Sequence, residues 1–184
     1  MEQGQHYAVN LLKALEYASQ MHRDQRRKGV EASPYINHPI QVAEVLATVG
    51  EVEDLETLMA AVLHDTVEDT DTTFMDLSNK FGSEVSDLVA EVTDDKSLPK
   101  TERKKQQVKH APTLSEKAKM IKIADKICNV RDIGSKPPMD WDEERRKQYF
   151  EWAESVVAGC SGVNSQLEAY FHDCVAESRA LLLG

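Results

Sequence analysis

Apolar residues recur along this chain at intervals of three and four, the spacing of one face of an α-helix. Glycines, prolines and clusters of small polar residues divide the pattern into segments. No segment keeps the alternation of a β-strand, so the pattern predicts an all-α domain. The predicted helices lie at about 5–22, 39–49, 54–68, 73–81, 83–92, 101–110, 115–133, 140–158 and 164–183.

Two of these helices carry predictions about which face is buried. The apolar stripe of the first, a predicted core helix, consists of Val9, Leu12, Leu15, Ala18 and Met21. Pro39 suits the first turn of the second helix, where its missing N–H is not needed, and this leaves His38 just before the helix. The predicted apolar face of that helix consists of Ile40, Ala43, Val45 and Leu46.

The chain of 184 residues is predicted to form one domain over 1–184. Hydrophobic residues make up 41% and charged residues 29%, which is typical of a soluble globular protein. No apolar run approaches the roughly 20 residues of a membrane span, and the N-terminus has no secretory signal. Three cysteines without a CxxC pair favour reduced thiols in a cytoplasmic protein.

A net charge of −10 argues against non-specific binding to nucleic acid or to anionic membranes. The charge is not evenly spread. One basic island spans 23–28, and a second spans 96–109 with six Lys or Arg residues against the single acid Glu102. These islands predict a local site for an anion, although the second fits a solvated surface equally well. The sequence specifies no oligomeric state.

Four residues that could bind a metal or exchange a proton lie close together in the segment 63–70. In a helix over 54–68, His64 and Glu68 would be four apart, and so would Asp65 and Asp69, which gives two adjacent strips. The residues upstream are apolar, so the strips end a helix that belongs to the core. Burying a carboxylate costs several kcal/mol unless it is paired or bound to a metal. The alternative is an acidic helix end in water.

Asp125 is a second unusual acid because it lies within the apolar run 121–127. Its carboxylate should be partly buried and should need a cation, and a salt bridge to Lys122 or Lys126 would satisfy that need without any metal. Together with His38, His64 and Asp65, Asp125 gives a nitrogen and oxygen ligand set that suits a divalent ion such as Mn²⁺. Four protein ligands would leave positions open for water and substrate.

The chain resembles the HD-domain metal phosphohydrolases, and within them the small stand-alone RelA/SpoT-type alarmone hydrolases. The resemblance covers nearly the whole chain. It rests on the segments 22–28, Asn-His-Pro at 37–39, His-Asp-Thr-Val-Glu-Asp-Thr at 64–70, 93–100, Ala-Asp-Lys-Ile-Cys-Asn-Val-Arg-Asp at 124–132 and 149–152. It implies an all-α HD-domain helical bundle that hydrolyses the 3′-pyrophosphate of guanosine tetra- or pentaphosphate to GDP or GTP and pyrophosphate. No synthetase domain is expected.

The family's functional residues carry over to positions in this sequence. The metal ligands match His38, His64, Asp65 and Asp125, which would hold a single Mn²⁺. The catalytic acids match Glu68 and Asp69. The nucleotide contacts match Arg27, Lys28, Asn129, Arg145 and Tyr149. The remaining histidines are expected at the surface or in the core.

Two alternatives remain open. The same pocket could accept another phosphorylated nucleotide, such as NADPH losing its 2′-phosphate. The chain could instead be a non-catalytic nucleotide sensor. Glu68 and Asp69 argue against the sensor, because a binding protein has little use for acids that activate water.

Overall fold

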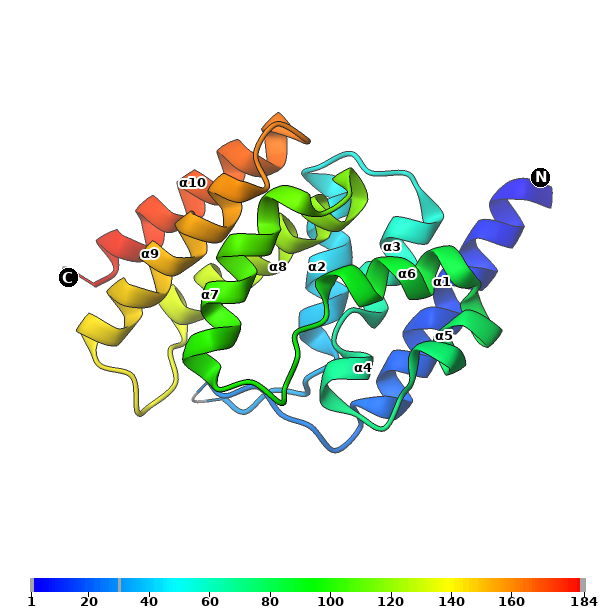
Figure 1. Ribbon diagram of the computed structural model, residues 1–184, viewed down its shortest axis with the longest axis horizontal. Helices are drawn as coiled ribbons and strands as arrows, with labels where there is room; N and C mark the ends of the chain where they lie inside the picture. The colour runs from blue at the N-terminus through cyan, green and yellow to red at the C-terminus, as the bar shows by residue number, and fades with distance from the viewer. Residues whose placement is uncertain (1, 30, 183–184) are drawn as a thin grey trace.

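The computed structural model describes residues 2–29 and 31–182, and its regular structure is helical throughout them (Figure 1). This confirms the predicted all-α fold class. Among the described residues the only strand-like pairing is an isolated bridge between Arg26 and Pro34. The helices are α1 (Glu2–Met21), α2 (Asn37–Thr48), α3 (Leu55–Leu63), α4 (Thr66–Asp69), α5 (Phe74–Phe81), α6 (Ser83–Val92), α7 (Lys100–His110), the 3₁₀ helix η1 (Ala111–Thr113), α8 (Glu116–Ser135), α9 (Glu143–Gly159) and α10 (Ser165–Ala180).

Helix α8 is the centre of the fold. The side chain of Ser115 caps its start by accepting a hydrogen bond from the N–H of Ala118 at 3.2 Å. Helices α2, α3, α6, α9 and α10 all pack against α8, and burying each large aliphatic side chain contributes about 1.5–3 kcal/mol. Polar residues of α8 are therefore held inside the molecule. Its buried apolar residues are Ala118, Ile121, Ile123, Ala124, Ile127, Cys128, Val130 and Ile133.

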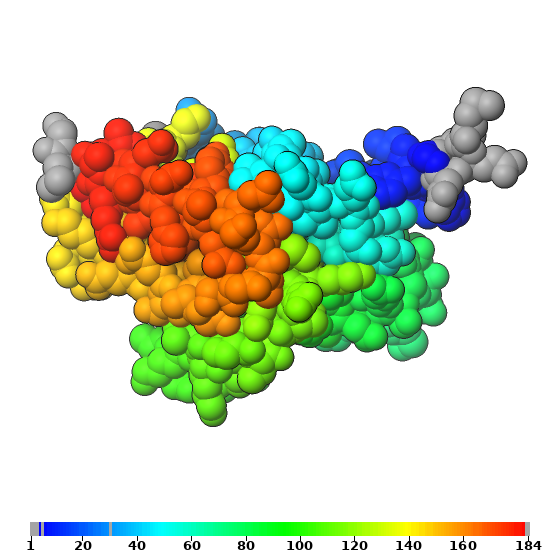
Figure 2. Space-filling view, turned by 90° about the horizontal axis from the view of Figure 1, so that it is seen from above, coloured from blue at the N-terminus to red at the C-terminus, as the bar shows by residue number. Residues whose placement is uncertain are grey.

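Helices α8 and α10 approach each other closely at Gly134. A Cβ at this position would collide with the side chain of Ser178, whose hydroxyl donates a hydrogen bond to the carbonyl of Val130 at 3.2 Å. Helices α9 and α10 cover one end of the molecule, and the first turns of α1 lie at the other end (Figure 2).

The buried face of α1 differs from the prediction. Ala14 and Ala18 are fully buried, whereas Val9 and Leu12 are 42% and 63% exposed and Met21 also faces solvent. The predicted stripe is confirmed at Ala18 and at Leu15, which packs partly buried against the core, but it was wrong at its other three members. Residues spaced strictly by three drift around a helix of 3.6 residues per turn. A spacing of four, mixed with spacings of three, keeps residues on the face that packs against α3.

Helix α2 begins at Asn37, so His38 lies inside its first turn and not before it as predicted. Pro39 is tolerated there because the first N–H groups of a helix have no partner within it. Ile40 was wrongly placed on the apolar face. It is 43% exposed, and Val42 is buried in its place.

The predicted helix over 54–68 is interrupted. Helix α3 ends at Leu63, a turn follows, and α4 starts at Thr66. Local side chains cause the break, because His64 Nδ1 lies 2.7 Å from the carbonyl of Ala61 and the Thr66 hydroxyl donates to the carbonyl of Leu63 at 2.7 Å. The single continuous helix that was predicted is therefore absent, and His64 and Asp65 lie at a bend between helices.

The described part of the chain contains no helix long and apolar enough to span a bilayer. Cys128, Cys160 and Cys174 are buried free thiols, as the sequence predicts.

Candidate active site

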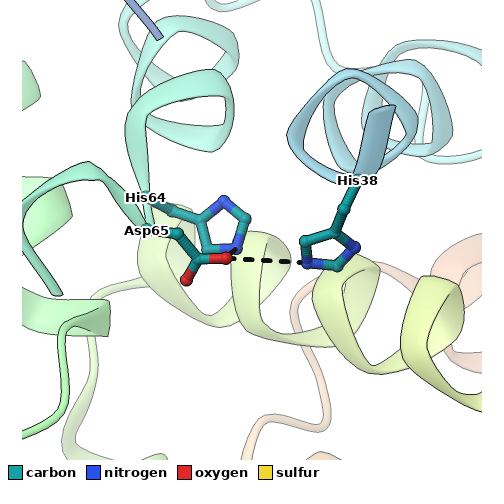
Figure 3. A group of neighbouring side chains, drawn as sticks. All are labelled: His38, His64 and Asp65. Atoms are coloured by element: carbon teal, nitrogen blue, oxygen red, sulfur yellow. Dashed lines mark ion pairs between the residues drawn. The ribbon is translucent and has the colours of Figure 1, made fainter. Parts of the chain in front are cut away.

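Three predicted metal ligands meet where α2 faces the bend after α3 (Figure 3). His38 Nε2 lies 3.8 Å from Asp65 Oδ2, and His64 Nε2 lies 3.2 Å from the same oxygen. One donor atom from each of the three residues falls within 4.8 Å of the others. A divalent ion bound by mixed nitrogen and oxygen ligands needs a cluster of this kind.

Asp125 reaches the same cluster from the middle of α8. Its Oδ1 lies 3.1 Å from His38 Nε2 and 4.0 Å from His64 Nε2. Its other oxygen accepts a hydrogen bond from Lys126 Nζ at 2.8 Å. The predicted salt bridge therefore exists to Lys126, whereas Lys122 donates to a backbone carbonyl instead. Asp125 forms this salt bridge and also belongs to the ligand cluster. Its two predicted roles, as a salt-bridge partner and as a metal ligand, therefore do not exclude each other.

The hydrogen bonding of His64 prepares one nitrogen for a metal. Its Nδ1 is placed to donate to the carbonyl of Ala61, and in the neutral ring this leaves an unprotonated Nε2. That Nε2 is buried and has no hydrogen-bond partner among the described residues. Burial alone would lower the pKa of His64, but Asp65 and Asp125 outweigh it and raise the pKa to about 9. The field that favours a proton here also favours a divalent cation, so these residues fit a metal.

The two predicted catalytic acids lie on α4, immediately after the bend. Glu68 Oε2 accepts a hydrogen bond from the backbone N–H of Asp94 at 3.1 Å, and Arg103 Nη1 lies 3.5 Å from its other oxygen. Burial, and then the negative charge of Asp65, raise the pKa of Glu68. A carboxyl group with a raised pKa beside this group of His and Asp side chains is suited to accepting and returning a proton near neutral pH.

Asp69 is held between two partners from other segments. Gln25 Nε2 donates to its Oδ2 at 2.9 Å, and Lys96 Nζ contacts its Oδ1. The site contains two adjoining cavities, a smaller inner one at the His and Asp cluster and a larger outer one. Asp69 lines the outer cavity, whereas Glu68 lines both.

The first basic island lies at the start of a loop over 25–35, and hydrogen bonds across this loop position Arg27 at the site. Arg27 N–H donates to the carbonyl of Ser33 at 2.9 Å, and Tyr35 N–H donates to the carbonyl of Gln25 at 3.0 Å. The guanidinium of Arg27 donates from Nη2 to Asn129 Oδ1 at 2.8 Å and to Asp132 at 2.7 Å. Arg27 and Asn129 are thus in contact, and both line the walls of the site.

The site opens through two adjoining cavities. The inner one, of about 230 Å³, contains the His and Asp cluster. The outer one, of about 620 Å³, is lined by the basic loop, including Lys28. Tyr149 lines both. Arg145 lines neither, because its guanidinium stacks on the ring of Trp141 at 4.6 Å and faces Asp140 at 3.3 Å.

Sequence reasoning missed several residues of the cavity walls. The second basic island is not only a solvated surface, since Lys100, Arg103 and Lys104 line the inner cavity. No local signal in the sequence identifies them, because a basic run on a polar helix looks the same whether it faces water or a cavity. Tyr35 was also missed, and its hydroxyl donates to Asp65 Oδ2 at 2.5 Å. Further wall residues that were not predicted are Gln25, Asp94, Lys96, Gln107, Trp141 and Trp152.

The other histidines divide as the sequence predicts between core and surface. His22 is buried and its ring packs on that of Tyr35, with 4.8 Å between centroids. His6, His110 and His172 are exposed.

Comparisons with known proteins agree with this fold and site. A family model of the HD domain matches residues 14–154. The chain is 52% identical over 158 residues to the guanosine-3′,5′-bis(diphosphate) 3′-pyrophosphohydrolase MESH1 of Danio rerio, covering 86% of this chain and 88% of that protein. It is 53% identical over 161 residues to the protein of the same name from Mus musculus, covering 88% and 90%.

A solved structure is also similar to the chain, with a TM-score of 0.89 and 46% identity over 91% of this chain and 94% of that one. It is described as a metazoan ortholog of SpoT that hydrolyses ppGpp and plays a role in starvation responses. The helical fold and the His and Asp cluster define an HD-domain protein. The chain belongs to this family and, within it, to the small RelA/SpoT-type group that contains the MESH1 proteins.

Proposed function

We propose that this chain hydrolyses the 3′-pyrophosphate of guanosine tetra- or pentaphosphate, giving GDP or GTP and pyrophosphate. One observation carries the proposal: the His and Asp cluster, with the acid Glu68 beside it, opens into a cavity walled by lysines and arginines. Such a site suits a polyanionic phosphate ester. The proposal is supported by the names of relatives that are 52% and 53% identical to the chain.

His38, His64, Asp65 and Asp125 would hold one divalent ion, and we propose Mn²⁺ because the ligand set mixes imidazole and carboxylate. When bound, the ion would supply Lewis-acid polarisation of a phosphoryl oxygen and would activate a water molecule. Tyr35 would steady Asp65 through the hydrogen bond of 2.5 Å from its hydroxyl.

Glu68 and Asp69 would handle the protons of the reaction. The oxygen of the attacking water forms a bond to the phosphorus next to the ribose, and the bond from that phosphorus to the 3′ oxygen breaks. One acid takes a proton from the water and a proton is returned to the departing 3′ oxygen, so the products are a free 3′-hydroxyl and pyrophosphate. The raised pKa of Glu68 suits this exchange.

Arg27, Lys28 and Asn129 would bind the nucleotide from the wall of the outer cavity. Tyr149, which lines both cavities, would contact it between them. Arg145 would act from further out, because it reaches the site only through the ring of Trp141. We further propose that residues 1–184 form a single domain and that the protein acts in the cytoplasm.

The proposal is tested by incubating the purified protein, with and without Mn²⁺, with guanosine 5′-diphosphate 3′-diphosphate and, in parallel, with NADPH. Release of GDP and pyrophosphate in equal amounts is the expected result. If the protein hydrolyses NADPH and not the guanosine tetraphosphate, the proposed substrate is wrong. If it binds either nucleotide but hydrolyses neither, the protein is a nucleotide sensor and not an enzyme.

A further inference from the structure

The inner cavity is too small for the whole proposed substrate. At about 230 Å³ it falls below the roughly 300–1,000 Å³ typical of pockets for drug-sized ligands. The outer cavity, with the basic loop around it, is the larger space. A nucleotide whose 3′-diphosphate reaches the His and Asp cluster would therefore place its nucleoside in the outer cavity, and only its 3′-phosphates would fit further in.

Both cavities have cationic walls, but the inner cavity has three lysines that the outer cavity does not share. Lys104 of α7 and Lys122 and Lys126 of α8 line the inner cavity and not the outer one. Lys126 is committed to Asp125 by its hydrogen bond of 2.8 Å. The other two lysines form no salt bridge with a carboxylate among the described residues, so neither is neutralised by a direct contact.

Lys122 is a buried cation with spare donors. The residue is 8% exposed, and its Nζ donates one hydrogen bond, to the carbonyl of Val92 at 2.7 Å. An ammonium group has three N–H donors, and no other acceptor for them lies within hydrogen-bond distance in the described part of the chain. An ammonium group buried without a direct anionic partner is costly, so a bound phosphate oxygen would supply a contact that the protein itself does not.

Lys104 lines the same inner cavity from α7, whereas Lys122 lines it from α8. Its Nζ lies 4.5 Å from the ring centroid of Trp152 and 5.4 Å from that of Tyr149, contacts that hold the chain in place without neutralising it. Burial, and then the positive charge of Lys100, lower its pKa. Cations that crowd one another in this way create a field that favours an anion.

The acids of the same cavity are fewer than its cations. Its wall carries four carboxylates, those of Asp65, Glu68, Asp94 and Asp125, against six lysine and arginine side chains. Glu68 has Arg103 within 3.5 Å and Asp125 has Lys126 at 2.8 Å, whereas Lys104 and Lys122 have no carboxylate in direct contact among the described residues. These two lysines are therefore the ones placed to meet phosphate oxygens.

We propose that Lys104 and Lys122 form the subsite for the distal phosphate of the 3′-diphosphate, the phosphate that water does not attack. This inference rests on the proposed function and adds to it the expectation that a 3′-diphosphate binds more tightly than a 3′-monophosphate. The attacked phosphorus lies at the His and Asp cluster, and the outer phosphate extends to the two lysines.

The test compares two ligands that differ only by the distal phosphate, guanosine 5′-diphosphate 3′-diphosphate and guanosine 5′-diphosphate 3′-monophosphate. Each is measured as a substrate or, when it is not turned over, as a competitive inhibitor. The variants are Lys104→Met and Lys122→Met. The matched control is Lys105→Met, since Lys105 neighbours Lys104 on α7 but has a side chain 77% exposed and lines neither cavity.

Losing one hydrogen bond to a charged group should weaken binding of the diphosphate about ten- to hundred-fold. Binding of the monophosphate should change little, and the control should bind both ligands like the wild type. Equal weakening of both ligands, or of neither, would overturn the subsite. Thermal unfolding checks that each variant is folded, and the half-buried Lys104 keeps the test decisive if Lys122→Met is unstable. A wild-type protein that neither binds nor hydrolyses the tetraphosphate would instead overturn the proposed function.

Discussion

The side chain of Gln25 donates a hydrogen bond from Nε2 to Asp69 Oδ2 at 2.9 Å, while its Oε1 lies 2.6 Å from His22 Nδ1. Because an amide oxygen can only accept, His22 must donate from Nδ1, and the two contacts fix the orientation of the amide. Gln25 follows directly from α1 in the chain, whereas Asp69 lies on α4. A residue with no chemical role of its own thus sets the direction of a proposed catalytic carboxylate.

Replacing Gln25 with Leu should therefore slow the reaction without removing any reacting group. We expect kcat to fall roughly ten- to hundred-fold, the value of one hydrogen bond to a charged group, with KM little changed. Steady-state kinetics measures both constants. Gln20→Leu is the control, because Gln20 is exposed and contacts only Glu16. A change in KM with constant kcat would show that Gln25 serves substrate binding and does not position Asp69.

Glu68→Gln keeps the size of the side chain but removes its basicity. General acid–base groups contribute about 10²–10⁴-fold in rate, so kcat should fall within that range while bound metal stays near one per chain. Kinetics and metal analysis on the same preparation measure the two quantities. Glu143→Gln, at an exposed pair with Lys147, is the control. Loss of metal together with activity would make Glu68 a metal ligand, and full activity would remove it from the mechanism.

Lys28→Ala should raise KM and leave kcat and metal content intact. Lys28 is exposed on the wall of the outer cavity, so its charge can act on the substrate but not on the reacting atoms. We expect a several-fold effect that shrinks as salt is added, since exposed charges are screened. Arg23→Ala is the matched control, because Arg23 belongs to the same basic island but pairs with Asp24 at 3.0 Å. An effect of equal size in both variants would indicate a general charge effect and no specific contact.

Arg27→Ala should have a broader effect than Lys28→Ala. Arg27 also holds Asn129 and Asp132, and Asn129 in turn donates to Asp125 at 2.5 Å. The variant should therefore weaken metal binding as well as raise KM. Metal titration measures the first effect and steady-state kinetics the second. Unchanged metal affinity would mean that the cluster is positioned independently of the basic loop.

Gly134→Ala tests the packing of α8 against α10. The added methyl group would meet Ser178, and overpacking of this kind typically costs about 1–3 kcal/mol. For a chain of this length we expect Tm to fall by several degrees, about 2–4 °C for each kcal/mol. Gly4→Ala is the control, because nothing lies within 4 Å of the Cβ it would add. If both variants melt alike, the two helices can separate at this point without cost.

The helices themselves were largely predictable from the sequence, because their signals are local. Gly82, with a φ of 94°, separates α5 from α6, between the helices predicted at 73–81 and 83–92. Helix α8 begins at Glu116, one residue after the predicted start, and Ser115 caps it. The break at His64 was not predicted. It depends on two hydrogen bonds from side chains to nearby carbonyls, which compete with the helix and which the apolar spacing does not reveal.

The candidate site was predictable where a residue type contradicts its surroundings, as Asp125 does within an apolar helix. The lysines of α7 gave no such signal, because a basic run on a polar helix looks the same whether it faces water or a cavity. Only the packing of α7 beside α9 distinguishes the two, since it places Trp152 Nε1 3.1 Å from the carbonyl of Lys104. Information of this kind lies in tertiary contacts and not in local spacing.

The metal dependence of pyrophosphate release tests the central claim most directly. Protein treated with EDTA should lose both activity and thermal stability, because the ligands come from α2, the bend after α3 and α8, and the ion joins these segments. Adding back Mn²⁺ should restore release of pyrophosphate from guanosine 5′-diphosphate 3′-diphosphate and should saturate near one ion per chain. Pyrophosphate release and melting that are both unchanged by EDTA would contradict the claim that this cluster is a metal site.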